Sequence, residues 1–493
     1  MLLLRTAAIR QLEADYLPHT PLMERAGKAA ADYADALMTD RCGAILVIAG
    51  SGNNGGDAYV CARHLKARGH SVVLASPAAT QPLPADAEAA RTDWLAMDGQ
   101  ISETLPEAKH YALAIDGLFG IGLSRPITAP HAQWIDLLNT LSCPVLSLDI
   151  PSGLNADTGA IMGCCVRANY TMTFLAAKPG LYTLAGRDHA GEVSCASLEV
   201  DASPFAAQAG RLISTADFES ALKPRQHNSH KGTNGNVTII GGAPGMAGAA
   251  LLASRAALHL GAGRVYVGML EKLALDYVQP ELMLRGVVDA IEQATAIGIG
   301  PGLGQSEAAV AALKSAIATD KPLAIDADAL NLIAEHPVLV THIARRTAST
   351  LLTPHPTEAA RLLGTDTAAI QNDRIQSALA LAQRFNAAIV LKGSGSVIAL
   401  PSNDKKSGHW YVNGNGNGGL ATAGTGDVLL GFVTALLAQG NDAATSLLAA
   451  VHLHGAAADL LVETGTGPIG LTASELIATA RGIWNNWITS QQA

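Results

Sequence analysis

The chain has 493 residues, of which 49% are hydrophobic and 15% are charged, so it is not a disordered chain and exceeds what one hydrophobic core usually serves. We expect two domains. The formal net charge of −9 and the lack of extended basic clusters argue against a nucleic-acid partner.

The cysteines and the apolar segments indicate in which cellular compartment the protein is found. All six cysteines lie in the first 195 residues and none forms a C-x-x-C pair, which is typical of reduced thiols. The apolar run near Val428 to Ala438 is far shorter than the roughly 18 residues that a membrane span needs. In the opening stretch MLLLRTAAIRQLE, Arg5 and Arg10 follow the apolar residues, unlike the order in a signal peptide. We therefore expect a soluble, cytoplasmic protein that does not bind membranes, and we expect it to be a homo-oligomer.

The first half of the chain alternates short β-rich runs with helical patterns between about residues 41 and 200. The β-rich runs read AILVIAG, SVVLAS, YALAID, PVLSLDI and YTMTFLA. This alternation is typical of a parallel sheet with helices on both faces. It predicts an α/β domain over residues 1–215.

A glycine-rich stretch, GSGNNGGDA, follows the first of these runs, so we expect Gly50 to Asp57 to form a loop between a strand and a helix. A dinucleotide fingerprint is a weak interpretation, since Asn53 and Asn54 interrupt it and no acidic residue ends the next strand. Amide and carboxylate oxygens instead suit a hard cation. Other loops add the oxygens of Asp116, Asp149 and Ser152, although a strand-end aspartate often does no more than cap a turn.

Together the segments NNGGDA, DGLFGIGLSRP, DIPSGLNADTG and FLAAKPGL resemble the NAD(P)H-hydrate epimerase domain, a Rossmann-like three-layer sandwich, over roughly Leu12 to Val200. The resemblance implies interconversion of the R and S hydrates of NADH and NADPH, called NADHX and NADPHX. It also implies K⁺ bound by Asn54, Asp116 and Ser152. The implied substrate contacts are Asn53, Asn54, Gly55, Gly56, Asp57, Gly120, Ile121, Gly122, Leu123, Ser124, Arg125, Pro126 and Asp149.

Two roles in this first site stay open. Asp116 is expected to serve proton transfer as well as the cation, but the sequence does not settle which carboxylate performs the acid-base step. Lys178, in AAKPG, is either a substrate contact or a surface lysine at a turn.

The stretch from Asp201 to Gly235 lacks strong periodicity, and we place the domain boundary within it, giving a second domain over residues 216–493. Further strand patterns follow, NVTIIGG, RVYVG, AIGIGPGLG, PLAIDADAL, TLLTPHPTE and AIVLKGSGS, and residues 426–482 are helical in pattern. These runs predict a second α/β domain. The basic cluster KPRQHNSHKG before them is either a solvated linker or an anion-binding loop.

The segment AGTGDVLLG places glycines and an aspartate at the start of an apolar helix. Gly424, Thr425 and Gly426 would present backbone N–H groups at the helix N-terminus, where phosphoryl charge is stabilised. Asp427 would accept a proton from an attacking hydroxyl. The alternative is a simple capped turn.

The segments HKGTNGNVTIIGG, GAPGMAGAA, GPGLG, DADALN, TPHPTEAARLLG, LKGSGSVI and GNGGLATAGTGDVLLG occur in this order and resemble the ribokinase-like NAD(P)H-hydrate dehydratase domain. The resemblance implies that ADP drives dehydration of the S hydrate, with AMP and phosphate released, and that Mg²⁺ takes part through ligands that the sequence does not name. Asp427 is the expected catalytic base. His230 and Lys231 then favour anion binding. The implied contacts to the hydrate are Ala249, Gly302, His355 and Asp427, and those to the nucleotide are Lys392, Gly393, Ser394, Gly395, Ser396 and Gly426.

A different interpretation remains open at this stage. The second half would be a ribokinase-like kinase that phosphorylates a small molecule, and the first half a Rossmann-like binding module without activity. The presence of Asn54, Asp116, Asp149 and Ser152 argues against an inactive first half.

Overall fold

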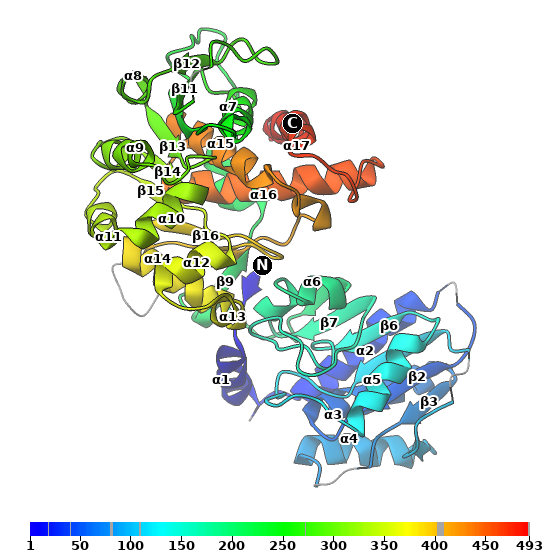
Figure 1. Cartoon of the computed structure of the whole chain (residues 1–493). Helices are drawn as coiled ribbons and strands as arrows, with labels where there is room; N and C mark the ends of the chain where they lie inside the picture. The colour runs from blue at the N-terminus through cyan, green and yellow to red at the C-terminus, as the bar shows by residue number, and fades with distance from the viewer. Residues whose placement is uncertain are drawn as a thin grey trace. The chain divides into compact units, whose positions relative to one another are not determined.

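The structure is a computed structural model that describes residues 1–17, 19–39, 41–78, 82–107, 110–271, 273–401 and 409–491. The chain folds into two compact units, Met1–Arg211 and Leu212–Ala493, coloured blue to green and green to red in Figure 1. The predicted boundary after residue 215 lies four residues beyond this division.

The first unit is built on a parallel sheet with the strand order β4-β3-β2-β5-β6-β7-β8. Two short strands outside it, β1 and β9, pair antiparallel with each other. The strands are β1 (Leu2–Leu3), β2 (Ile45–Ala49), β3 (Val72–Ala75), β4 (Ile101–Ser102), β5 (Leu113–Gly117), β6 (Val145–Leu148), β7 (Tyr170–Phe174), β8 (Glu192–Ala196) and β9 (Gly210–Leu212).

The sequence ILVIA of β2 shows why helices must cover both faces of this sheet. Every side chain of β2 is buried. Ile45, Val47 and Ala49 join a core with α1 to α4, whereas Leu46 and Ile48 join a separate core with α5. The helices are α1 (Thr6–Tyr16), α2 (Leu22–Leu37), α3 (Asn53–Ala67), α4 (Ala85–Ala96), α5 (His131–Thr140) and α6 (Gly186–His189), with 3₁₀ turns at Pro179–Leu181 and Ser203–Phe205.

The second unit contains the strand order β18-β17-β16-β15-β14-β13-β10-β11-β12. The pairs from β12 to β16 are parallel, whereas β17 pairs antiparallel with both β16 and β18. The strands are β10 (Asn236–Gly241), β11 (Arg264–Met269), β12 (Met283–Arg285), β13 (Ala296–Ile299), β14 (Leu323–Ile325), β15 (Thr350–Leu352), β16 (Ala388–Leu391), β17 (Val397–Ala399) and β18 (Trp410–Val412).

The helices of the second unit include the predicted helical region near its C-terminus, which forms α15 to α17. The central helix α15 packs against α7, α16, β13 and β10. The helices are α7 (Ala247–His259), α8 (Val287–Gln293), α9 (Glu307–Ile317), α10 (Ala327–Glu335), α11 (Pro337–Ala344), α12 (Pro356–Leu363), α13 (Thr367–Asn372), α14 (Arg374–Phe385), α15 (Thr425–Ala438), α16 (Ala443–Glu463) and α17 (Ala473–Ser490), with 3₁₀ turns at Thr215–Ala221 and Gly418–Leu420.

Within the described residues, α16 alone is long and apolar enough to cross a membrane by length and composition. However, 67% of its apolar window is buried inside the protein. Its buried residues, such as Leu447 and Leu453, belong to the main core of the second unit. This burial is that of a core helix in an α/β fold.

Candidate active sites

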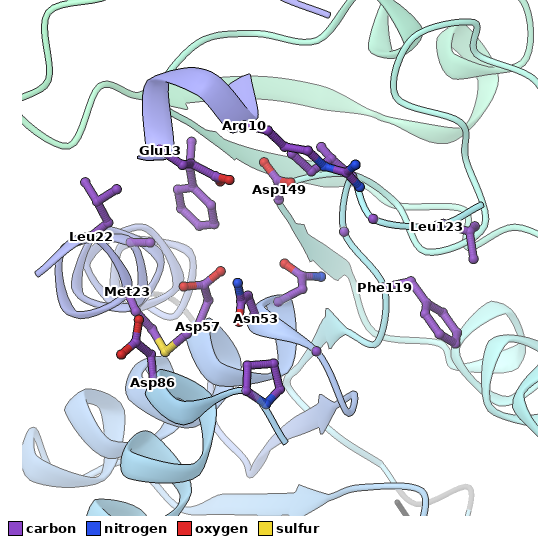
Figure 2. Close-up of a pocket in the computed structure, with 18 of the residues that line it drawn as sticks. Arg10, Glu13, Leu22, Met23, Asn53, Asp57, Asp86, Phe119, Leu123 and Asp149 are labelled. Carbon is purple, nitrogen blue, oxygen red and sulfur yellow. The ribbon is translucent and has the colours of Figure 1, made fainter. Parts of the chain in front are cut away.

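A cavity of about 640 Å³ lies in the first unit at the carboxyl ends of β2, β5 and β6 (Figure 2). The strand order reverses between β2 and β5, which is where open α/β sheets bind ligands. Of the residues predicted for this site, the cavity is lined by Asn53, Asn54, Asp57, Gly120, Ile121, Gly122, Leu123, Ser124, Arg125, Asp149 and Lys178. Gly55, Gly56 and Pro126 are not among its lining residues.

The expectation of a loop from Gly50 to Asp57 is wrong in part, because α3 already begins at Asn53. The helix starts early because its glycines permit very close packing. A Cβ on Gly55 would lie 1.9 Å from the Gly50 carbonyl oxygen, and one on Gly56 would lie 2.5 Å from the Met23 sulfur. These glycines therefore hold the helix against its neighbours, while Asn53, Asn54 and Asp57 near the start of α3 line the cavity.

Asp116 lies beneath the cavity and is fully buried. Ser147 Oγ donates to its Oδ2 at 2.8 Å, while the Ser152 hydroxyl and backbone N–H donate to Oδ1 and Oδ2 at 2.6 and 2.9 Å. Burial raises the pKa of Asp116 and the hydrogen bonds from Ser152 oppose that rise. Since Asp116 is not a lining residue, its position favours organising the site over direct contact with substrate.

Asn54, in the first turn of α3, has a side chain whose hydrogen-bonding groups are not satisfied by the described part of the protein. Its side-chain oxygen and nitrogen are both buried and have no hydrogen-bond partner among the described residues. A buried polar group without a partner costs free energy, so this carboxamide is suited to a ligand. A Cβ on Gly120 would lie 3.3 Å from both the Asn54 Cβ and the Asp149 Oδ2, which places these two side chains around the same glycine.

Lys178 is not a surface residue, so that interpretation of the sequence is wrong. It is fully buried, forms an ion pair with Asp149, and donates to Thr173 Oγ1 at 3.0 Å and to the Phe174 carbonyl oxygen at 2.8 Å. Asp149 itself has a positive φ of 63°, an uncommon conformation for a residue other than glycine. Strain of this kind is typical of functional sites.

Besides Asp149, the acidic residues Glu13, Asp57 and Asp86 line this cavity, and of these three the sequence predicted only Asp57. Burial raises the pKa of Asp57 well above its usual value, and Asp149 adds to this rise. Glu13 comes from α1 and lines the same cavity, and burial followed by the Asp149 carboxylate raises its pKa as well. Figure 2 shows the carboxyl groups of Glu13, Asp57 and Asp149 directed toward one space.

The second site is centred on Asp427, in the first turn of α15. The preceding Gly424 has a φ of 88°, so the chain enters the helix through a left-handed residue that favours glycine. Burial and the nearby Asp326 raise the pKa of Asp427 to about 7, against the opposing charge of Lys392. A carboxylate poised near neutrality at a helix N-terminus is suited to accept a proton there.

Lys392 connects Asp427 with the other predicted residues. Its Nζ lies 2.7 Å from Asp326 Oδ1, and a Cβ on Gly426 would lie 3.4 Å from the same nitrogen. Burial alone would lower the pKa of Lys392, but the carboxylates of Asp326 and Glu358 outweigh burial and raise it. This lysine is therefore a stable cation next to the backbone of Gly426.

His355 is the N-cap of α12, and Glu358 completes a capping box with it. His355 Nδ1 accepts from the Thr357 N–H at 3.1 Å, while Glu358 Oε2 accepts from the His355 N–H at 2.7 Å. Burial and the charge of Lys392 lower the pKa of His355, so this histidine is neutral near pH 7. Burial raises the pKa of Glu358 to about 7.

Glycines also shape the remaining parts of this site. Gly302 has a φ of 55°, and a Cβ there would lie 2.5 Å from the Met246 carbonyl oxygen and 3.3 Å from the Ala249 Cβ. The predicted contacts Ala249 and Gly302 are therefore neighbours.

The buried guanidinium of Arg374 stabilises the loop that carries Gly393 and Ser396. It donates hydrogen bonds to the carbonyl oxygens of Leu391, Lys392 and Gly395.

The structure thus brings together most predicted residues of the second site, because each follows the carboxyl end of a strand or begins a helix there. Sequence reasoning missed Asp326, Glu358 and Arg374. The motifs DADALN and TPHPTE contain the first two, so the signal was present as strand-end acidic residues. His230 and Lys231 are exposed, and His230 Nδ1 accepts from the Gly232 N–H at 3.1 Å.

Within the part of the chain that the structure describes, no group of three His, Cys, Asp or Glu side chains has the arrangement of a metal site. The predicted K⁺ ligands Asn54, Asp116 and Ser152 would instead offer amide, carboxylate and hydroxyl oxygens, and a nucleotide would bring its own phosphate ligands to Mg²⁺.

Comparison with known proteins matches both units. The family described as NAD(P)H-hydrate dehydratase matches residues 237–481, and the family described as YjeF-related protein N-terminus matches residues 19–180. The bifunctional NAD(P)H-hydrate repair enzyme Nnr of Escherichia coli is 40% identical over 480 residues, covering 95% of this chain and 90% of that protein. The enzyme of the same name from Coxiella burnetii is 37% identical over 476 residues and covers 94% of each chain.

The chain belongs to the family of bifunctional NAD(P)H-hydrate repair enzymes. It carries an epimerase domain and a ribokinase-like dehydratase domain. Among solved structures, the ADP/ATP-dependent NAD(P)H-hydrate dehydratase of Bacillus subtilis, co-crystallised with ATP and Mg²⁺, is 31% identical with a TM-score of 0.48 and covers 56% of this chain and 99% of that one.

Proposed function

We propose that the two units of this repair enzyme act in succession on one damaged cofactor. The first unit interconverts the R and S hydrates of NADHX and NADPHX in the cavity lined by Asn53, Asp57 and Asp149. The second unit dehydrates the S hydrate and consumes ADP. A dehydratase that accepts one epimer leaves the other unused, which is why both activities on one chain make chemical sense.

The observation that carries the second half of this proposal is the position of Asp427 beside Lys392 and Asp326. The Asp427 carboxylate removes the proton of the hydrate hydroxyl as that oxygen attacks the β-phosphorus of ADP, and AMP leaves. The new phosphate ester then loses phosphate and a ring proton, which restores the double bond of NADH. Phosphorylation is needed because a hydroxyl is a poor leaving group.

The nucleotide is held by groups whose geometry suits phosphate. The backbone N–H groups at the start of α15 and the Lys392 ammonium supply positive potential. The loop from Gly393 to Ser396 lies next to them and is fixed by Arg374. Mg²⁺ fits here as the partner of the phosphates, since the carboxylates of Asp326 and Asp427 lie close enough to interact. When bound, it neutralises phosphate charge.

In the first unit, K⁺ fits the residues present because the Asn54 carboxamide is buried without a protein partner. Asn54, Asp116 and Ser152 would hold the ion, which would supply positive charge near the anionic substrate. Asp116→Asn is expected to weaken K⁺ dependence of epimerisation. Equal epimerisation rates and equal K⁺ dependence in Asp116→Asn and the wild type would remove this assignment.

The free thiols of all six cysteines and the small number of basic residues support a soluble cytoplasmic protein, which we propose acts as a homo-oligomer without nucleic acid.

In the experiment that tests the proposed function, purified protein is incubated with the S hydrate and ADP. We expect one AMP and one phosphate for each NADH formed. Consumption of ATP to phosphorylate a small hydroxymethyl compound, without NADH formation, would support a ribokinase-like kinase instead.

A further inference from the structure

The start of α3 and the loop after β6 carry the motif residues that line the cavity of the first unit. Helix α1, which carries no motif, also lines this cavity. This helix lies before the region that matches the family of the first unit, which begins at residue 19. Arg10 and Glu13 of α1 line the cavity together with Leu17. The start of α1 is fixed because Thr6 donates from its backbone N–H and its hydroxyl to Asp157 Oδ1 at 2.6 and 2.9 Å.

We propose that Glu13 is a catalytic residue of the epimerase, donating the proton that allows the hydroxyl of the hydrated ring to leave as water. This inference rests on the proposed function of the first unit. Three observations carry it: the position of Glu13 in the cavity wall, its half-buried side chain, and its proximity to Asp57, Asp149 and Lys178.

The hydroxyl-bearing ring carbon adjoins the ring nitrogen, so its C–O bond breaks with help from the nitrogen lone pair. The Glu13 proton goes to the departing oxygen, giving water, a cyclic iminium ion and the Glu13 carboxylate. Water then adds to the opposite face of the ring carbon and releases its proton to Asp149. Exchange of protons with solvent returns both groups to their starting states, so no proton is gained or lost overall.

The surroundings of Glu13 favour this role over a structural one. No described residue hydrogen-bonds its carboxyl group or forms an ion pair with it, so the proton is available to a ligand. Burial raises its pKa, which increases the protonated fraction near neutrality. The other charged groups that line the cavity are Arg10, Asp57, Asp86, Arg125, Asp149 and Lys178.

Asp149 differs from Glu13 in a way that separates the two roles. Lys178 forms an ion pair with Asp149, whereas no described residue forms an ion pair with Glu13. One carboxyl group with an ammonium partner and one without such a partner have different surroundings, which suits a base and an acid.

The test compares Glu13→Gln with the matched control Asp15→Asn in the full chain. Asp15 is exposed on the same helix and pairs with Gln11, outside the cavity. We expect Glu13→Gln to lower the kcat of R/S interconversion by roughly 10²–10⁴-fold with little change in KM, and to remove the alkaline limb of the pH profile. Asp15→Asn should match the wild type, and S-hydrate dehydration should be unchanged in both variants.

A kcat for Glu13→Gln within about threefold of the wild type would overturn the proposal, as would a rise in KM alone, which would indicate a binding contact. Glu13→Asp retains the acid and should recover part of the lost rate. If Glu13→Asp and Glu13→Gln lose epimerisation equally, the role is structural and the proposal is wrong. If the wild type itself lacks epimerisation, the proposed function of the first unit is wrong.

Discussion

At the scale of single residues, the proposed role of Asp427 as the base predicts the pH dependence of the dehydratase. Its pKa of about 7 means that the proton-accepting form is lost as the pH falls through neutrality. The kcat of dehydration should therefore decline below about pH 7, while Asp427→Asn should show a rate lower by roughly 10²–10⁴-fold. The measurement is NADH formation from the S hydrate with ADP between pH 5.5 and 8.5.

Epimerisation by the same Asp427→Asn sample provides the control, because its residues lie in the other unit. Dehydration near the wild-type rate would exclude Asp427 as the base and leave it as a helix cap, which asparagine preserves. Parallel loss of both activities would indicate misfolding.

The raised pKa of Asp427 also predicts a stability effect. A carboxyl group whose pKa is raised in the folded state stabilises the fold below its unfolded pKa, near 4, and this contribution disappears as the pH rises through about 7. Asp427→Asn should therefore unfold at a higher temperature than the wild type at pH 8, and the difference should shrink toward pH 4. Scanning calorimetry at both pH values measures this, and a constant difference would contradict the assigned pKa.

The ion pair between Lys392 and Asp326 predicts that removal of the lysine lowers the free energy of unfolding. Asp326 is almost fully buried, so Lys392→Met leaves its carboxylate without a charged partner. The free energy of unfolding should fall by about 3–5 kcal/mol. The double variant Lys392→Met/Asp326→Asn removes the stranded charge and should recover part of the loss. Chemical denaturation of the single and double variants tests this, and additive losses would show that the two residues act independently.

At the scale of elements, the loop after β5 offers two glycines with different surroundings. A Cβ on Gly120 would meet the Asn54 Cβ and Asp149 Oδ2 at 3.3 Å, whereas one on Gly122 would meet nothing within 4 Å. Gly120→Ala should displace these side chains and lower epimerisation by at least about tenfold, because small misplacements reduce catalysis strongly. Gly122→Ala should lower the epimerisation rate less than Gly120→Ala does, since its Cβ displaces no protein side chain. Equal rates in the two alanine variants would contradict the geometry around Gly120.

The sequence predicted the central parallel strands, because buried strands appear as continuous apolar runs. It did not predict the parallel strands β4, β8 and β12 or the antiparallel strands β1, β9, β17 and β18, since these strands are short or poorly buried and depend on their neighbours. The start of α3 at Asn53 was also missed. Glycine is a poor helix former, and only close packing of Gly55 and Gly56 against tertiary neighbours explains the helical start.

The residues of the two candidate sites also differ in whether the sequence alone can predict them. Residues within motifs, such as Asp427 and Asp149, can be predicted from sequence because glycines and strand ends mark them. Glu13 lies on a helix without a motif, and only its place in the cavity wall reveals it. The burial of Lys178 likewise depends on its ion pair with Asp149, 29 residues away in the chain.

At the scale of the whole molecule, each unit has its own hydrophobic core. Fragments 1–211 and 212–493 should therefore fold separately, and each should keep its own reaction. Calorimetry and the two activity assays check this. Failure of both fragments to give a cooperative thermal transition would contradict the division into two independent units.

If one chain holds two active sites for the same damaged dinucleotide, it should repair both epimers of that dinucleotide. The most direct measurement incubates the full-length protein with an equal mixture of R and S hydrates and excess ADP, beside fragment 212–493 under the same conditions. We predict complete recovery of NADH by the full-length protein, and recovery of only the S half by the fragment. Recovery that stops at the S half with the full-length protein would contradict the account.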